Sequence, residues 1–230
     1  MLRRQGVCLV TLAVVIGTAA TTPALAGNGL YMGATVGSSI FHADKSDFDN
    51  AVLDAFDETG LAVISGTSTL DKASVNFSGV IGYQFMRELA IEGSYTDLGK
   101  LRYHASNVLA NRVNASTELD AKAKGPTVAV IGALPLSQEW EIYARLGIIV
   151  SKVTLEAQAT LSSSAGTATG APSSKSSNSV DALAGVGLAW NPTKHVKLRA
   201  EYIRYGNVGD KDTTGEINID TFNAGLTYSF

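Results

Sequence analysis

In the last stretch of the chain, residues 219–230, polar and apolar side chains alternate from Thr221 to Phe230. In an extended strand, the apolar positions share one face and the polar positions share the other. The apolar face ends in three large residues, Leu226, Tyr228 and Phe230. A soluble sheet can show the same alternation, but it seldom exposes two aromatic residues at its C-terminus. The pattern therefore predicts the last strand of a membrane β-barrel.

The other end of the sequence has the three-part form of a secretory signal peptide over residues 1–26. Two arginines near the start are followed by an apolar run at residues 7–20, and Ala24 and Ala26 form a small-x-small cleavage site. This run is shorter than the roughly 20 residues that a spanning helix needs. We therefore expect cleavage after Ala26 and export of the mature chain, rather than an uncleaved membrane anchor.

The mature chain, residues 27–230, is acidic and has no cysteine. Removing the two arginines from 18 basic residues leaves 16 against 21 acidic ones, a net charge of −5. This balance gives no reason to expect nucleic acid as a partner. The single cysteine, Cys8, lies in the signal peptide, so the mature fold needs no disulfide. No linker divides the sequence, which favours one domain.

Seven further stretches alternate with a period of two and are bounded by Gly, Pro, Asn, Asp or Ser. Together with the last strand, they span residues 30–41, 74–85, 89–98, 123–136, 140–155, 180–190, 196–205 and 219–230. We therefore predict an all-β fold over residues 27–230, an eight-stranded antiparallel up-and-down transmembrane β-barrel.

The connections between these strands alternate in length. Residues 86–88, 137–139 and 191–195 are tight turns, whereas residues 42–73, 99–122, 156–179 and 206–218 are longer. If the first strand starts in the periplasm, every short turn lies on the periplasmic side of the membrane and every long loop lies outside the cell, as in bacterial outer-membrane barrels. A soluble sandwich gives no reason for such alternation. Within the long loops we expect a short helix at residues 50–56 and disorder at residues 161–178.

The two faces of the predicted strands differ in character. The face that is rich in Gly and Ser carries five mid-strand charges: Glu92, Arg145, Asp181, Arg199 and Glu201. The opposite face carries mainly Leu, Ile, Val and Ala, with large aromatic residues near the short turns: Tyr83, Phe85, Trp140 and Trp190. Aromatic residues at one level indicate a girdle at the periplasmic interface. We therefore predict that the polar face lines the barrel; a soluble barrel turned the other way is the alternative.

An eight-stranded barrel is just wide enough for its own side chains to fill. Charges in such an interior must be paired, because an isolated ion taken out of water costs several kcal/mol. Arg145 and Arg199 balance Glu92 and Glu201, so these four residues could form one network. We favour a structural polar core, with a gated ion path as the alternative.

Two predicted hairpins share a pattern in which an inward Glu is followed by a Tyr one or three residues later. They occupy residues 82–99 and 187–206. With residues 132–136 and the closing Tyr228-Ser229-Phe230, these hairpins resemble the OmpA-type outer-membrane β-barrel family, which includes the opacity-like proteins. The resemblance covers nearly all of the mature chain. Its motifs are short and degenerate, so they identify the fold class rather than an individual protein.

This resemblance implies a monomeric barrel in the outer membrane of a Gram-negative bacterium, surrounded by outer-membrane lipids and lipopolysaccharide. It also implies insertion by the outer-membrane assembly machinery, which reads the last strand, so Tyr228 and Phe230 would be the assembly signal. Larger family members continue into a peptidoglycan-binding domain. This sequence stops at Phe230, so the resemblance gives no support for a peptidoglycan tether.

The sequence gives little sign of catalysis or of a metal site. The histidines, His42, His104 and His195, have no Ser and acid at a local motif spacing, although a triad assembled only in space would leave no such signal. The acidic loop 42–73 lacks the glycine of a calcium loop. We therefore expect no catalytic residue, no metal and no cofactor.

The sequence thus predicts a structural role in envelope integrity, or surface interaction and adhesion, and not an enzyme. A narrow diffusion channel is the runner-up, and an outer-membrane lipid-modifying enzyme is third. Any surface ligand would bind through loops 42–73 and 156–179.

Overall fold

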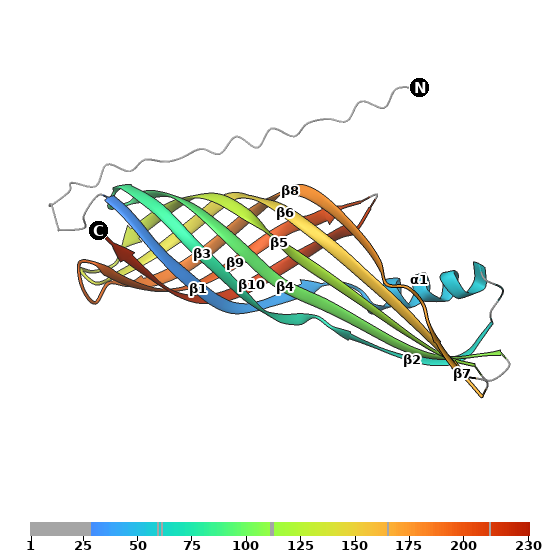
Figure 1. Ribbon diagram of the computed structural model, residues 1–230. Coiled ribbons are helices and arrows are strands. Elements are labelled where there is room, and N and C mark those ends of the chain that lie inside the picture. The colour runs from blue at the N-terminus through green and yellow to red at the C-terminus, as the bar shows by residue number, and fades with distance from the viewer. Residues whose placement is uncertain (1–28, 59, 61, 111–112, 165, 212) are drawn as a thin grey trace, which may run out of the picture.

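Eight long strands close into a single antiparallel barrel in the computed structural model, which describes residues 29–58, 60, 62–110, 113–164, 166–211 and 213–230 (Figure 1). The strands are β1 (Gly29–His42), β3 (Ala73–Met86), β4 (Leu89–Leu109), β5 (Val113–Pro135), β6 (Trp140–Ser163), β8 (Ser173–Trp190), β9 (Val196–Asp210) and β10 (Gly215–Ser229). Each pairs with the next in this order. The ring closes where β10 pairs with β1, with Tyr31 opposite Ser229. The predicted eight-stranded fold is confirmed.

The predicted signal peptide and its cleavage site at Ala24 and Ala26 lie outside the described residues. Three short turns follow Met86, Pro135 and Trp190, as predicted, and they gather at one end of the barrel. We call this end the short-turn end. Within the described residues, no helix combines the length and the apolar character that crossing a membrane would require.

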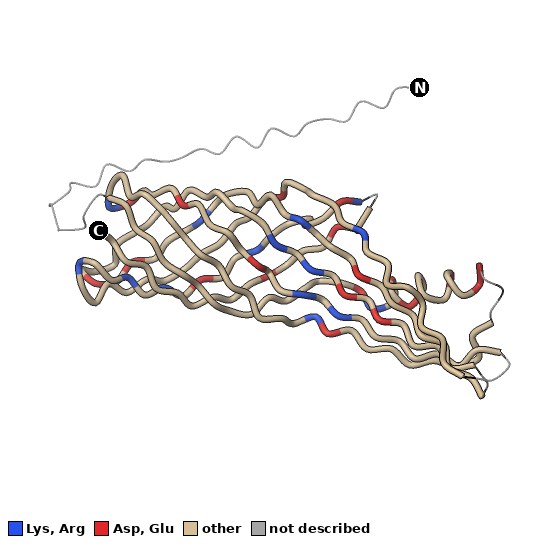
Figure 2. Tube along the Cα trace, in the orientation of Figure 1, with Lys and Arg blue, Asp and Glu red and all other residues tan. Residues whose placement is uncertain are grey.

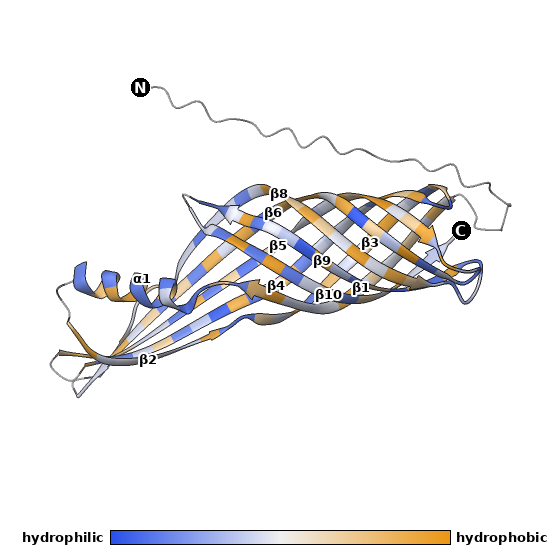
Figure 3. Cartoon of the chain, turned by 180° about the vertical axis from the view of Figure 1, so that it is seen from behind, coloured by the Kyte–Doolittle hydropathy of each residue, from blue (hydrophilic) through white to orange (hydrophobic). Residues whose placement is uncertain are grey.

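The lipid-facing side of the barrel is apolar. Exposed aliphatic side chains follow one face of each strand, as at Met32, Ile81, Val130 and Ile148. Figure 3 shows the hydrophobic residues concentrated along the barrel toward the short-turn end. The outward face therefore matches the apolar face predicted from the alternation.

Several strands continue beyond the closed ring of the barrel. We call the part of the protein that they form there the extension. It contains the helix α1 (Lys45–Glu58), the strands β2 (Val63–Asp71) and β7 (Gly166–Thr169), and the outer parts of four barrel strands: residues 100–109, 113–124, 152–163 and 173–179. Strand β2 pairs with β4, and β7 pairs with the end of β6. Figure 1 shows these elements projecting from the end opposite the short turns.

The extension corrects three predictions about the long loops. Residues 99–122 form mostly paired strand, and residues 161–178, expected to be disordered, contain the end of β6, all of β7 and the start of β8. Small Ser, Thr and Ala residues gain strand structure there because β5 and β6 pair along their full length, from Asn114 opposite Ser162 onward. The helix is also longer than predicted. It covers Lys45–Glu58 because Val52 and its neighbour Phe48 pack against the sheet beneath them.

Candidate functional site

The barrel interior holds a network of four buried charges. Glu92 comes from β4, Arg145 from β6, and Arg199 and Glu201 from β9. Arg199 makes a bidentate contact with Glu92, with Nη1–Oε2 at 2.7 Å and Nη2–Oε1 at 3.2 Å. Arg145 Nη2 also donates to Glu92 Oε1 and lies 3.6 Å from Glu201 Oε2. The structure therefore brings together four of the five charged residues singled out in the sequence.

Two tyrosines that the sequence analysis did not select complete this network. The Tyr31 hydroxyl donates to Glu92 Oε2 at 3.2 Å, and the Tyr143 hydroxyl donates to Glu201 Oε2 at 3.0 Å. Each ring lies over a glycine directly opposite on the neighbouring strand, Gly82 for Tyr31 and Gly187 for Tyr143. A Cβ at either glycine would overlap the ring, which explains why these positions have no side chain. Sequence analysis could have selected both residues, because each is a tyrosine on the otherwise polar face of its strand.

Asp181 is not part of the four-charge network. It accepts hydrogen bonds from Ser151 at 2.8 Å and from Ser179 at 2.7 Å, farther toward the extension. Both hydroxyl groups donate to the same carboxylate oxygen, Oδ2, and no cation of the described residues forms an ion pair with Asp181. Sequence position alone grouped Asp181 with the others, because the polar face gives no measure of height along the barrel.

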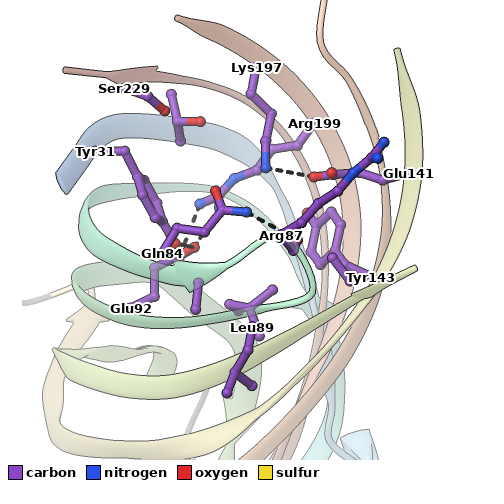
Figure 4. A pocket seen from close by; sticks show the side chains of 14 residues that line it. Tyr31, Gln84, Arg87, Leu89, Glu92, Glu141, Tyr143, Lys197, Arg199 and Ser229 are labelled. Atoms are coloured by element: carbon purple, nitrogen blue, oxygen red, sulfur yellow. Dashed lines mark hydrogen bonds and ion pairs between the residues drawn. The ribbon is translucent and has the colours of Figure 1, made fainter. Parts of the chain in front are cut away.

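A further ion pair lies between the network and the short-turn end. Lys197 Nζ and Glu141 Oε1 are 2.6 Å apart, although neither residue was placed in the predicted network. Figure 4 shows this pair beside a small cavity that Tyr31, Glu92 and Arg199 also line. Charged side chains thus continue from the network toward the barrel mouth.

Above the network, on the side of the extension, large apolar side chains fill much of the interior, among buried polar ones such as Asp181, which lies directly opposite Ile149. We call these apolar residues the apolar layer. Its buried members include Leu98, Ile149, Leu183, Ile203 and Ile219, at 0–4% exposure. They belong to one cluster of buried residues with Phe41, Tyr205 and Val208. The polar face does line the barrel, as predicted, but at this level it also carries large buried apolar side chains. These residues follow the inward register of their strands, and packing against one another removes them from both lipid and water.

The lumen is filled by these two layers. The cavity on the short-turn side of the network has a volume of about 30 Å³, and a second one, lined by Arg145 and Glu201, has about 10 Å³. Holding one water molecule takes on the order of 10–15 Å³ on this measure. The cavities beside the network therefore have room for a few waters at most.

The predicted girdle residues all point outward near the short-turn end. Trp140 and Trp190 are opposite one another and stack with ring centroids 6.0 Å apart, while Tyr83 and Phe85 meet edge to face at 5.1 Å. In the last strand, the rings of Tyr228 and Phe230 meet edge to face, with their centroids 5.4 Å apart. Amphipathic aromatic rings at this level suit a membrane interface.

Comparisons with known proteins point to one family. The model of the OmpA-like transmembrane domain matches residues 25–230. Outer membrane protein A of Serratia marcescens is 28% identical over 88% of this chain and 50% of its own length, and its namesake in Yersinia pseudotuberculosis is 25% identical over 76% and 45%. The chain thus spans about half the length of these curated relatives. The N-terminal β-barrel domain of Pseudomonas aeruginosa OprF is similar with a TM-score of 0.44 and 12% identity, over 89% of this chain and 99% of that domain.

Proposed function

Because the chain belongs to the OmpA-like transmembrane domain family and is an outer-membrane protein, we propose that it is a closed structural barrel that supports the envelope. Its extension would lie outside the cell, where α1, β2 and β7 form a surface for contact with other molecules. The short turns would face the periplasm. This role agrees with the predicted one and requires no transport through the lumen.

The observation that carries the proposal is the double closure of the lumen. The network of Glu92, Arg145, Arg199 and Glu201 occupies one level, and the apolar layer around Ile149 occupies the next. An ion crossing the barrel would have to disrupt buried pairs and then pass the packed side chains of the apolar layer. Both steps are costly, because charges lose their partners in the first and their water in the second.

A narrow diffusion channel is the second candidate function. It is favoured by a hollow of about 360 Å³ at the short-turn mouth, which Glu141, His195 and Lys197 help to line. This polar entrance leads toward the network. A channel would require rearrangement of both the charged and the apolar layers.

Conductance across a planar lipid bilayer tests the proposal. We expect the purified protein to give no regular unitary current, because both layers block the lumen. The variant Arg145→Leu tests the network directly, and Arg102→Leu, which changes an exposed arginine of the extension, is the control. A steady wild-type current whose ion selectivity changes in Arg145→Leu, but not in Arg102→Leu, would contradict the closed barrel and support the channel.

A further inference from the structure

Three polar side chains on the outward face of the extension have the arrangement of a hydrolase triad. His104 Nε2 lies 3.2 Å from Ser106 Oγ, and His104 Nδ1 lies 3.7 Å from Glu118 Oε1. The histidine therefore has the serine at one ring nitrogen and the acid at the other. Such distances are often long before a substrate binds. All three side chains are exposed to solvent.

The sheet register holds these residues together. His104 and Ser106 are two positions apart on β4, so they share one face. The β4–β5 hairpin places Glu118 directly opposite His104, and Ser116 directly opposite Ser106. The other two histidines are engaged elsewhere: His42 contacts Asp220 at 2.7 Å, and His195 contacts the Ser229 carbonyl oxygen at 2.9 Å.

Ser106 also borders a shallow groove of about 490 Å³. Hydroxyl and amide groups of several further residues line it: Ser65, Thr67, Asn114, Ser116 and Thr160. Donors of this kind can stabilise the negative oxygen that forms when a carbonyl group is attacked. The nucleophile thus lies at a groove lined by candidate oxyanion donors, and its base, His104, contacts it from outside that lining.

We propose that Ser106, His104 and Glu118, with the groove that Ser106 borders, form the active site of a carboxylic ester hydrolase. His104 Nε2 takes the proton of Ser106 as Oγ attacks the ester carbonyl carbon, and it returns that proton to the alcohol as the ester C–O bond breaks. Water then attacks the acyl-serine, His104 accepts its proton, and Ser106 recovers a proton as the carboxylic acid leaves. Glu118 stays ionised and is a positioning residue that orients the imidazole. Ester and water give acid and alcohol, with no further reactant.

The same outward face suggests how the ester is presented. Between the apolar belt and the groove, Lys124 on β5 lies directly opposite Lys152 on β6 and, on its other side, opposite Asp97 on β4. Like charges in this position repel one another, and neither lysine forms an ion pair with any described residue. Figure 2 shows further basic residues, interspersed with acidic ones, where the barrel passes into the extension. Phosphate groups of an outer-leaflet lipid would neutralise the lysine pair, so the ester is one carried by an anionic lipid.

Labelling with a fluorophosphonate probe tests the nucleophile in the full-length purified barrel. We expect the probe to modify Ser106, and we expect the protein to hydrolyse p-nitrophenyl butyrate. Ser106→Ala should abolish labelling and lower hydrolysis at least about a hundredfold, as loss of a triad residue does. Ser174→Ala, which removes an exposed serine of β8, should change neither.

A positioning role for Glu118 predicts a specific kinetic result. Glu118→Gln should lower kcat with little change in KM, and Glu118→Asp should restore part of the loss, because an acid again faces the imidazole. Equal activity in all three proteins would remove Glu118 from the site. An unlabelled and inactive wild-type protein, or full activity in Ser106→Ala, would overturn the triad.

The source of the ester is tested by incubating the protein with bilayers of lipopolysaccharide and measuring released fatty acid. Release that depends on Ser106 and falls in Lys124→Gln/Lys152→Gln, but not in Lys175→Gln/Lys194→Gln, supports the anionic lipid. Hydrolysis of the soluble ester alone would uphold the triad and overturn the lipid assignment. These results do not depend on conductance, so they are separable from the proposed structural role.

Discussion

Two ion pairs of nearly equal length, one in the barrel and one in the extension, differ strongly in their exposure to solvent. Arg199 and Glu92 are 2.7 Å apart with side chains 5% and 3% exposed, whereas Lys122 and Glu156 are 2.8 Å apart with side chains 43% and 48% exposed. In the barrel, removing one partner leaves a charge where water does not reach it. In the extension, water solvates whichever charge remains. Burial, and not distance, therefore decides how much each pair matters.

The largest expected effect follows from removing the shared acid of the network. Glu92→Gln leaves Arg145 and Arg199 with only Glu201, so we expect a loss of about 3–5 kcal/mol in the free energy of unfolding. Urea unfolding in lipid vesicles, followed by tryptophan fluorescence, measures this change. Glu156→Gln is the matched control in the extension and should leave unfolding unaltered. Equal stability of the two variants would remove the contrast between buried and exposed pairs.

The apolar layer provides the next largest effect. Ile149→Ala opens a cavity among fully buried side chains, with an expected cost of about 2–4 kcal/mol. Ile148→Ala changes the adjacent residue, which points outward and is 48% exposed, so lipid can fill the space. The same unfolding measurement compares the two. If Ile148→Ala were the more damaging, the assignment of inward and outward faces on β6 would be wrong.

The smallest expected effect is a change with pH in how firmly α1 is held against the extension. Hydrogen bonds from Ser68, Tyr103 and Lys45 lower the pKa of Asp49 to about 2. A lowered pKa means that the carboxylate stabilises the fold above its ordinary pKa near 4, and that this contribution is lost as the pH falls from about 4 to about 2. Pepsin should therefore cut residues 45–58 faster at pH 2 than at pH 4, beyond the change in its own activity.

Asp49→Asn is the control for this loss of protection. An amide does not titrate in this range, so the variant should be cut readily at both pH values. A wild-type helix that is equally protected at pH 2 and pH 4 would show that Asp49 does not hold α1 in place.

Much of the barrel was predictable because period-two alternation reports which face of a strand is apolar. The alternation of residues 219–230 placed Leu226, Tyr228 and Phe230 outward, and the balance of four inward charges indicated a network before any contact was known. The same reasoning failed for the extension, because Ser- and Thr-rich residues 161–178 carry no strong strand pattern. They are ordered by pairing with neighbours, which is a property of the sheet and not of the segment.

The sequence alone determined the strand faces, the number of strands in the barrel and the position of the short turns, because each depends on neighbouring residues. Only the tertiary structure decided height along the barrel and contacts between strands. It separated Asp181 from the network, brought Tyr31 and Tyr143 into it, and added the apolar layer around Ile149. It also placed Glu118 beside His104, although Glu118 comes twelve positions after Ser106 in the chain. The physical reason is register: hydrogen bonding between strands sets which distant residues face one another, and alternation within one strand carries no record of that choice.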